Sequence, residues 1–227
     1  MQILHQNANK IKYWWLQQTH YKPLRIVHQH LKQHLSNEHL QELVNKLHSI
    51  NATCKGDGAG LSGGILTDMF IFEFFQQHVP GYSENHIGES DLKICDIPLS
   101  QKKINGKSII ALNWSKNKNK NPHQDPFNCD VMIINIKTEQ WWKKEPMQKH
   151  RIAKITFNDT IPSGIYFVNK QFCKHFVKLS SNNKTNTLIE SRYLYLMLKR
   201  SIQTDLFIAF PPPNKQYSFA ISNAFLE

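Results

Sequence analysis

Two acidic residues and a lysine lie close together near position 90. Glu84 precedes Asp91 by seven residues, and Lys93 follows Asp91 by two. In a β-strand, residues i and i+2 point to the same face, so Asp91 and Lys93 would share one side if residues 91–97 are extended. If the preceding turn brings Glu84 beside them, two carboxylates form an oxygen-rich site for a divalent cation, with an amine next to it. Such a site suits metal-assisted hydrolysis of a phosphodiester.

The spacing alone leaves a second interpretation open. An acid-x-Lys triplet arises readily by chance in a chain with 28 basic and 17 acidic residues. Such a pair at a strand end is then a surface salt bridge with little energetic weight. Support for chemistry therefore has to come from the residues around the triplet.

The chain upstream of this stretch adds a further acid and a glycine-rich loop. A helix predicted over residues 65–78 is almost wholly apolar and carries only two acids, Asp68 and Glu73. A buried acid is costly unless it is paired or near a metal, so one of the two is expected to face the site. Residues 51–64 hold five of the nine glycines but lack the order of a nucleotide P-loop. We expect this loop to approach a phosphate, with Lys55 as a contact.

Composition points to a polyanionic partner. The 227 residues carry a formal net charge of +11, with a sequence pI near 9.5, which favours nucleic acid first and a membrane surface second. No run of 18 apolar residues occurs, and the N-terminus lacks an apolar signal region. We therefore expect a soluble, cytoplasmic protein. The four cysteines include no Cys-x-x-Cys pair, which argues against a zinc site or a disulfide framework.

Lysines gather after the acid-x-Lys triplet. They flank a predicted hairpin and continue into a polar, repetitive segment that is expected to be a loop along phosphates. A solvated loop without a partner is the alternative. The lysines that we single out as phosphate contacts are Lys102, Lys103, Lys116, Lys118 and Lys120.

The order of elements predicts an α/β fold. Helices are expected in residues 1–50, and strands over 91–98 and 108–114 are expected to pair as an antiparallel hairpin through Asn105-Gly106. Other predicted elements are strands over 129–137, 152–157 and 205–210, a helix that starts at 169, and a helix over 188–202. We expect a mixed central β-sheet flanked by helices, with the site at the hairpin end of the sheet.

The candidate residues resemble a known active-site layout. Gly64-Ile-Leu-Thr-Asp68, Glu84 and Asp91-Leu-Lys93 are similar to the pattern of the mismatch-repair endonuclease MutH and the related GATC-cutting restriction endonucleases, which belong to the PD-(D/E)xK nucleases. The resemblance implies that Asp68 matches the helix acid, Glu84 and Asp91 the metal-binding acids, and Lys93 the catalytic lysine. Aspartate and glutamate are exchanged at all three acids. Glu89 is an alternative to Glu84, because Gly88 stands one residue further from Asp91 than in the family.

A second segment extends the resemblance towards DNA contacts. Residues 160–172 are similar to a segment of the same family in which a tyrosine lies at the DNA. The resemblance implies that Tyr166 contacts a base and that Lys170 contacts a phosphate or a base. A tyrosine on a core strand is the alternative interpretation.

The resemblance implies a restriction-endonuclease-like core and Mg²⁺-dependent, site-specific cutting of double-stranded DNA, with a 5′-phosphate and a 3′-hydroxyl as products. We expect a type II restriction endonuclease. The alternatives are a MutH-like nicking endonuclease and a non-catalytic DNA-binding protein on a nuclease scaffold. A single nuclease domain is expected, with a helical part (1–50), a catalytic core (55–175) and a C-terminal extension (176–227) as a candidate for DNA recognition. The expected state is a monomer or a homodimer, with a cognate DNA methyltransferase acting on the same site as a further partner.

Overall fold

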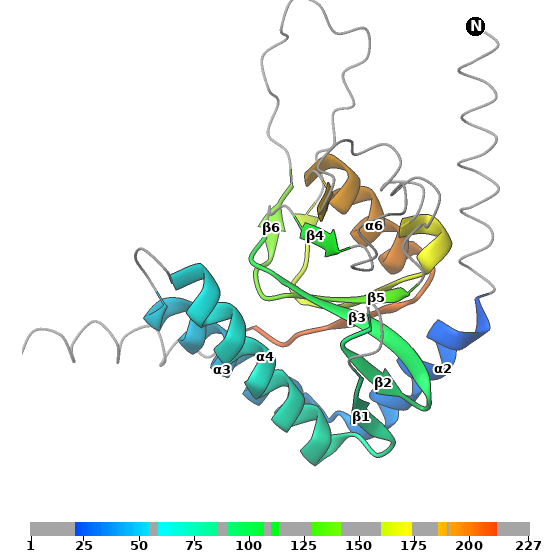
Figure 1. Ribbon diagram of the computed structural model, residues 1–227, viewed down its shortest axis with the longest axis horizontal. Coiled ribbons are helices and arrows are strands. Elements are labelled where there is room, and N and C mark those ends of the chain that lie inside the picture. Colours follow the sequence, from blue (N-terminus) through cyan, green and yellow to red (C-terminus); the bar gives the residue numbers. More distant parts are fainter. Residues whose placement is uncertain are drawn as a thin grey trace, which may run out of the picture.

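A mixed six-stranded sheet organises the part of the chain that the structure, a computed structural model, describes. This part comprises residues 21–54, 59–85, 90–106, 110–113, 129–141, 160–173, 186–189 and 191–212. The strand order is β1-β2-β3-β5-β8-β10 (Figure 1). The strands are β1 (Tyr82–Glu84), β2 (Leu92–Ile94), β3 (Ile97–Ile104), β5 (Asp130–Asn135), β8 (Gly164–Val168) and β10 (Phe207–Ala209). Because β3 and β5 are parallel and the other neighbours antiparallel, the sheet is mixed.

Helices cover both faces of this sheet (Figure 1). On one face lie α2 (Lys22–His34), α3 (Asn37–Thr53) and α4 (Ala59–His78), and on the other lies α6 (Ser191–Gln203). The predicted fold class, a mixed α/β sheet flanked by helices, is confirmed. Among the described helices, none combines the length and the hydropathy that a membrane span requires.

The central strand β5 shows why both faces are covered. Met132 and Ile134 pack with the α2, α3 and α4 side of the sheet, whereas Val131 and Ile133 pack with α6. Successive strand residues point to opposite faces, so an uninterrupted apolar run requires a cover on each side. The sequence of β5 therefore demands the three-layer arrangement.

The predicted hairpin differs from the observed one. Residues 91–98 do not form one strand, because Cys95 and Asp96 adopt positive φ values of 51° and 61° and turn the chain between β2 and β3. A two-residue hairpin turn of this kind is normally marked by glycine or asparagine, and neither is present here. β4 (Ile110–Asn113) pairs instead with β9 (Asn186–Ile189).

The other predicted helices and strands agree with the structure to different degrees. The strand over 205–210 corresponds to β10, and 129–137 contains β5. The helix predicted over 188–202 begins only at Ser191, because β9 occupies residues 186–189. A further small sheet pairs β6 (Glu139–Gln140) with β7 (Thr160–Ile161). The strand predicted over 152–157 lies outside the described residues.

Two glycines provide a matched test of the packing. Gly164 begins β8 with a φ of 157°, and a Cβ there would overlap the carbonyl oxygen of Ile208 on the neighbouring strand. We expect Gly164→Ala to lower the free energy of unfolding by about 1–3 kcal/mol through overpacking. A Cβ at Gly64, in helix α4, would meet nothing within 4 Å, so Gly64→Ala should raise it by about 0.5–1 kcal/mol. Urea denaturation measures both, and equal losses would contradict this account.

Candidate active site

Asp91 lies at the start of β2, beside the open edge of β3. Its backbone N–H donates to Leu99 O at 2.9 Å, so it prolongs the strand pairing by one residue. Its carboxylate atom Oδ2 accepts from the backbone N–H of Gln101 at 2.6 Å and from the Ser100 hydroxyl at 3.1 Å. Lys102 Nζ lies 3.9 Å from the same oxygen. Since these donors all meet Oδ2, the other carboxylate oxygen is left without a hydrogen bond from the described residues.

Asp68 on α4 reaches β3 through the side chain of Gln101. Gln101 Nε2 donates to Asp68 Oδ1 at 3.3 Å, which fixes the orientation of the amide, because a carboxylate can only accept. Burial of the carboxyl group, and then the nearby Asp91 carboxylate, raise the pKa of Asp68 above its usual value. The two predicted acids are thus within electrostatic reach of each other.

The amide oxygen of Gln101 is the most unusual atom of the site. Gln101 is 6% exposed, and its Oε1 is buried without a hydrogen-bond partner in the described part of the chain. Leaving a buried acceptor unpaired costs free energy, so such an atom usually serves a ligand or an ordered water. Amide and carboxylate oxygens are both ligands that Mg²⁺ accepts, and the Gln101 side chain also contacts the Asp68 carboxylate.

Lys103 places an amine on the same face of β3 as Gln101, two residues further along. Its Nζ donates to Thr67 Oγ1 at 3.2 Å. Burial lowers the pKa of Lys103, and the charge of Asp68 opposes this effect. Thr67 and Asp68 are consecutive on α4, so one turn of this helix contacts both side chains that β3 presents to it.

Close approach of two helices brings α4 to this position. A Cβ at Gly63 would lie 3.0 Å from Cys54 Cβ, at the end of α3. A larger residue at 63 would make a contact with Cys54 that is tighter than normal packing allows. Gly63 therefore has a packing role in the structure, whereas the predicted phosphate contact, Lys55, lies outside the described residues.

The two remaining predicted site residues lie on β1 and β2. Glu84 is exposed and pairs with Leu92, so β2 separates it from β3. Lys93 is half-buried and pairs with Pro98. This register puts Lys93 on the face of the hairpin opposite to Lys103, because paired residues share a face and neighbours along a strand alternate. Glu89 lies outside the described residues.

The predicted DNA contacts are only partly described. Lys102, Lys103 and Lys170 are half-buried, and the backbone N–H of Lys170 donates to Asp130 Oδ1 at 2.8 Å. Tyr166 is 0% exposed, and its hydroxyl donates to Pro162 O at 2.5 Å. A base cannot reach this ring, so the structure corrects the predicted contact: Tyr166 is a core residue. Lys116, Lys118 and Lys120 lie outside the described residues.

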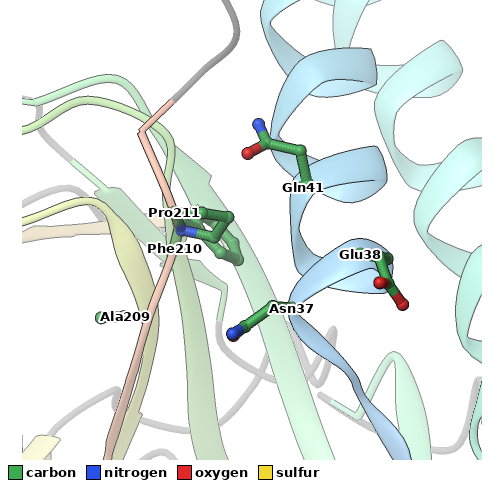
Figure 2. A pocket seen from close by; sticks show the side chains of 6 residues that line it. All are labelled: Asn37, Glu38, Gln41, Ala209, Phe210 and Pro211. Carbon is green, nitrogen blue, oxygen red and sulfur yellow. The ribbon is translucent and has the colours of Figure 1, made fainter.

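Outside the Asp68–Asp91 site, the described residues form an open hollow but no metal-binding cluster of acids, histidines or cysteines. No group of three or more His, Cys, Asp or Glu side chains in the described ranges is arranged to hold a metal, so an all-acid or histidine site is not found there. An open hollow between α3 and the segment after β10 is lined by Asn37, Glu38, Gln41, Ala209, Phe210 and Pro211 (Figure 2). None of these residues belongs to the Asp68–Asp91 site.

Comparisons with known proteins give one distant similarity. No protein-family model matches the sequence, and no curated protein matches it. A solved structure described as "Restriction endonuclease in complex with substrate DNA" is similar over 89% of this chain and 96% of that chain, with 13% sequence identity and a TM-score of 0.40. The function proposed below rests on the site residues and not on this similarity.

The electrostatic environment of Asp68 can be tested by measuring the thermal stability of a variant. A raised pKa means that the carboxylate is less favourable in the folded than in the unfolded state, so the charged form lowers stability at neutral pH. We expect Asp68→Asn to raise the melting temperature at neutral pH in EDTA. The gain should shrink as the pH falls through the pKa of Asp68, because the wild-type carboxyl group is then also neutral. Glu73→Gln, at an exposed acid of the same helix, is the control, and a lower melting temperature for Asp68→Asn alone would contradict this account.

Proposed function

We propose that the chain is a Mg²⁺-dependent nuclease that cuts double-stranded DNA at specific sites, as a type II restriction endonuclease of the PD-(D/E)xK kind. The observation that carries the proposal is the buried, unpartnered amide oxygen of Gln101, a residue whose side-chain nitrogen donates to Asp68 and whose backbone N–H donates to Asp91. Oxygen ligands of this kind are typical of magnesium sites in enzymes that act on phosphates.

The metal would be held by Asp91, Asp68 and Gln101 Oε1. The hydrogen bonds from Ser100 and the Gln101 backbone hold Asp91 in place before the metal arrives, which lowers the cost of ordering the site. When bound, Mg²⁺ supplies Lewis-acid chemistry at a phosphate oxygen. Glu84, or Glu89 in its place, remains a candidate for a further ligand.

The amine that assists the reaction is Lys103 in this proposal. It lies on the face of β3 that carries Gln101, close enough to Asp68 for their charges to interact. There it orients the attacking water and offsets negative charge that develops on the phosphate. Lys93, which the sequence resemblance favours, is the alternative on the opposite face of the hairpin.

Double-stranded DNA fits the charge of the molecule. With a net charge of +11, lysines can neutralise phosphates on either side of the site. Lys102, which lies 3.9 Å from Asp91, is the nearest of the described ones. The others that we propose as contacts are Lys55, Lys116, Lys118, Lys120 and Lys170. A cognate DNA methyltransferase acting on the same sites would protect the host's own DNA.

One observation favours a second candidate function. A glutamine stands where two carboxylates meet the sheet, so the site carries less negative charge than three acids would give. A non-catalytic DNA-binding protein on a nuclease scaffold would tolerate this loss. A MutH-like enzyme that nicks one strand is the other alternative, and its chemistry is closer to that of the main proposal.

Cleavage of supercoiled plasmid and bacteriophage DNA tests the function and chooses between the lysines. With Mg²⁺ we expect linear products with discrete ends, and with Ca²⁺ binding without cutting. Lys103→Met should lower the cleavage rate by about 100-fold or more, since it removes a charge that stabilises the transition state, and should leave DNA binding in Ca²⁺ nearly unchanged. Lys93→Met is the matched control. Loss of cutting in Lys93→Met alone would return the catalytic role to Lys93, and a protein that binds in both ions and never cuts would be the non-catalytic candidate.

Metal binding without DNA tests the ligands separately. Isothermal calorimetry with Mg²⁺ and with Mn²⁺ should show one site that Asp91→Asn abolishes. Gln101→Glu should bind either ion more tightly, because a carboxylate replaces a neutral oxygen and ligand charge raises affinity. Gln76→Glu makes the same change at an exposed position of α4 and should have no effect. Unchanged affinity in Gln101→Glu would remove Gln101 from the ligands.

A further inference from the structure

We propose that Thr67 is a positioning residue, whose hydroxyl group holds the Lys103 amine in the orientation that phosphodiester hydrolysis requires. This inference rests on the proposed function and adds to it a residue of α4 that contacts neither metal nor DNA. It is carried by the two hydrogen bonds of a single, almost completely buried hydroxyl group.

The direction of these hydrogen bonds is fixed by chemistry. Thr67 Oγ1 lies 2.6 Å from Gly63 O, a carbonyl that can only accept, so the hydroxyl proton points to Gly63. The lone pairs of the same oxygen are then available to accept from Lys103 Nζ at 3.2 Å. A hydroxyl group has one proton and two lone pairs. The result is a relay in which the backbone of α4 orients the hydroxyl and the hydroxyl orients the amine.

Burial makes this arrangement specific. Thr67 is 1% exposed, so water cannot take the position of its hydroxyl group between Gly63 and the amine without a rearrangement of α4. A lysine side chain has a flexible four-carbon stem. If its amine is already held in place, less conformational entropy is lost on the way to the transition state. Threonine is also a poorer helix former than alanine or leucine, so its presence in the middle of α4 is not explained by helix formation.

A second threonine shows what a purely structural role looks like. Thr53, near the end of α3, donates its hydroxyl to Ser49 O at 3.2 Å, the same bond to the carbonyl four residues earlier. Thr53 is exposed, and no lysine contact accompanies this bond among the described residues. Thr53→Val therefore removes an equivalent helix bond without touching Lys103, and provides a matched control.

The test compares three single variants with the wild type in the plasmid assay under single-turnover conditions with Mg²⁺, with DNA affinity measured separately in Ca²⁺. Thr67→Val keeps the shape of the side chain and removes the hydroxyl. We expect it to lower the cleavage rate constant by about 10- to 100-fold, as loss of a supporting partner commonly does, with less than about a twofold change in the dissociation constant for DNA. Thr67→Ser should restore most of the rate, and Thr53→Val should cut like the wild type.

A double variant separates positioning from general damage to the fold. In a Lys103→Met background, Thr67→Val should cause no further loss of rate, because the amine that it holds is already absent. Equal losses in both backgrounds, or failure of Thr67→Ser to rescue, would overturn the inference. If Thr67→Val cuts normally while Lys103→Met does not, the positioning role is wrong and the nuclease proposal stands. If no variant, including the wild type, cuts DNA, the proposed function itself is wrong.

Discussion

The central constraint on this structure is that two carboxylates, Asp68 and Asp91, are kept within electrostatic reach of each other where α4 meets the edge of β3. Partial burial of the carboxyl group, and then the like charge of Asp91, raise the pKa of Asp68 above its usual value. The fold maintains this unfavourable arrangement because α4 and the β2–β3 hairpin are each held by larger apolar contacts elsewhere. In the proposed function, a bound cation would offset the repulsion between the two carboxylates.

The unequal lengths of β2 and β3 create the place where the site forms. β2 ends its pairing at Leu92, opposite Leu99, while β3 continues to Ile104. The backbone N–H of Gln101 therefore has no partner strand on that side, and the Asp91 carboxylate takes the place of one. A backbone requirement of the sheet thus orients the side chain of Asp91, since a buried N–H group has to be satisfied.

Two of the predicted acids, Asp68 and Asp91, lie near each other in the structure, whereas Lys93 lies on the face of the hairpin opposite to Lys103. Asp68 stood out as an acid on an apolar helix, and Asp91 as the first member of an acid-x-Lys triplet, and the structure brings the two together around Gln101. The sequence predicts Lys103 only as a phosphate contact. Its relation to Gln101 and α4 depends on the turn at Cys95 and Asp96, whose positive φ values no glycine or asparagine announces. Once residues 91–98 are divided by that turn, Gln101-Lys102-Lys103 becomes a second triplet of the same form, with glutamine in place of the acid.

The predicted base contact of Tyr166 disagrees with the structure for a different reason. Motif similarity at residues 160–172 suggested a surface contact, yet Tyr166 lies between Ile165 and Phe167 in a strand buried on both faces. Short motifs do not report which layer covers a strand, whereas the apolar run around the tyrosine does. Here the hydrophobic pattern was the more reliable of the two signals.

The neutral side chain of Gln101 is consistent with the charges that surround it. A third carboxylate between Asp68 and Asp91 would add repulsion in a place from which water is largely excluded, with Lys102 and Lys103 as the neighbouring positive charges. An amide supplies an oxygen ligand without adding charge, and its nitrogen can also donate to Asp68, which a carboxylate could not do. The remaining cost is one buried oxygen without a hydrogen bond. That cost is smaller than the burial of a third charge, and a metal ion would remove it.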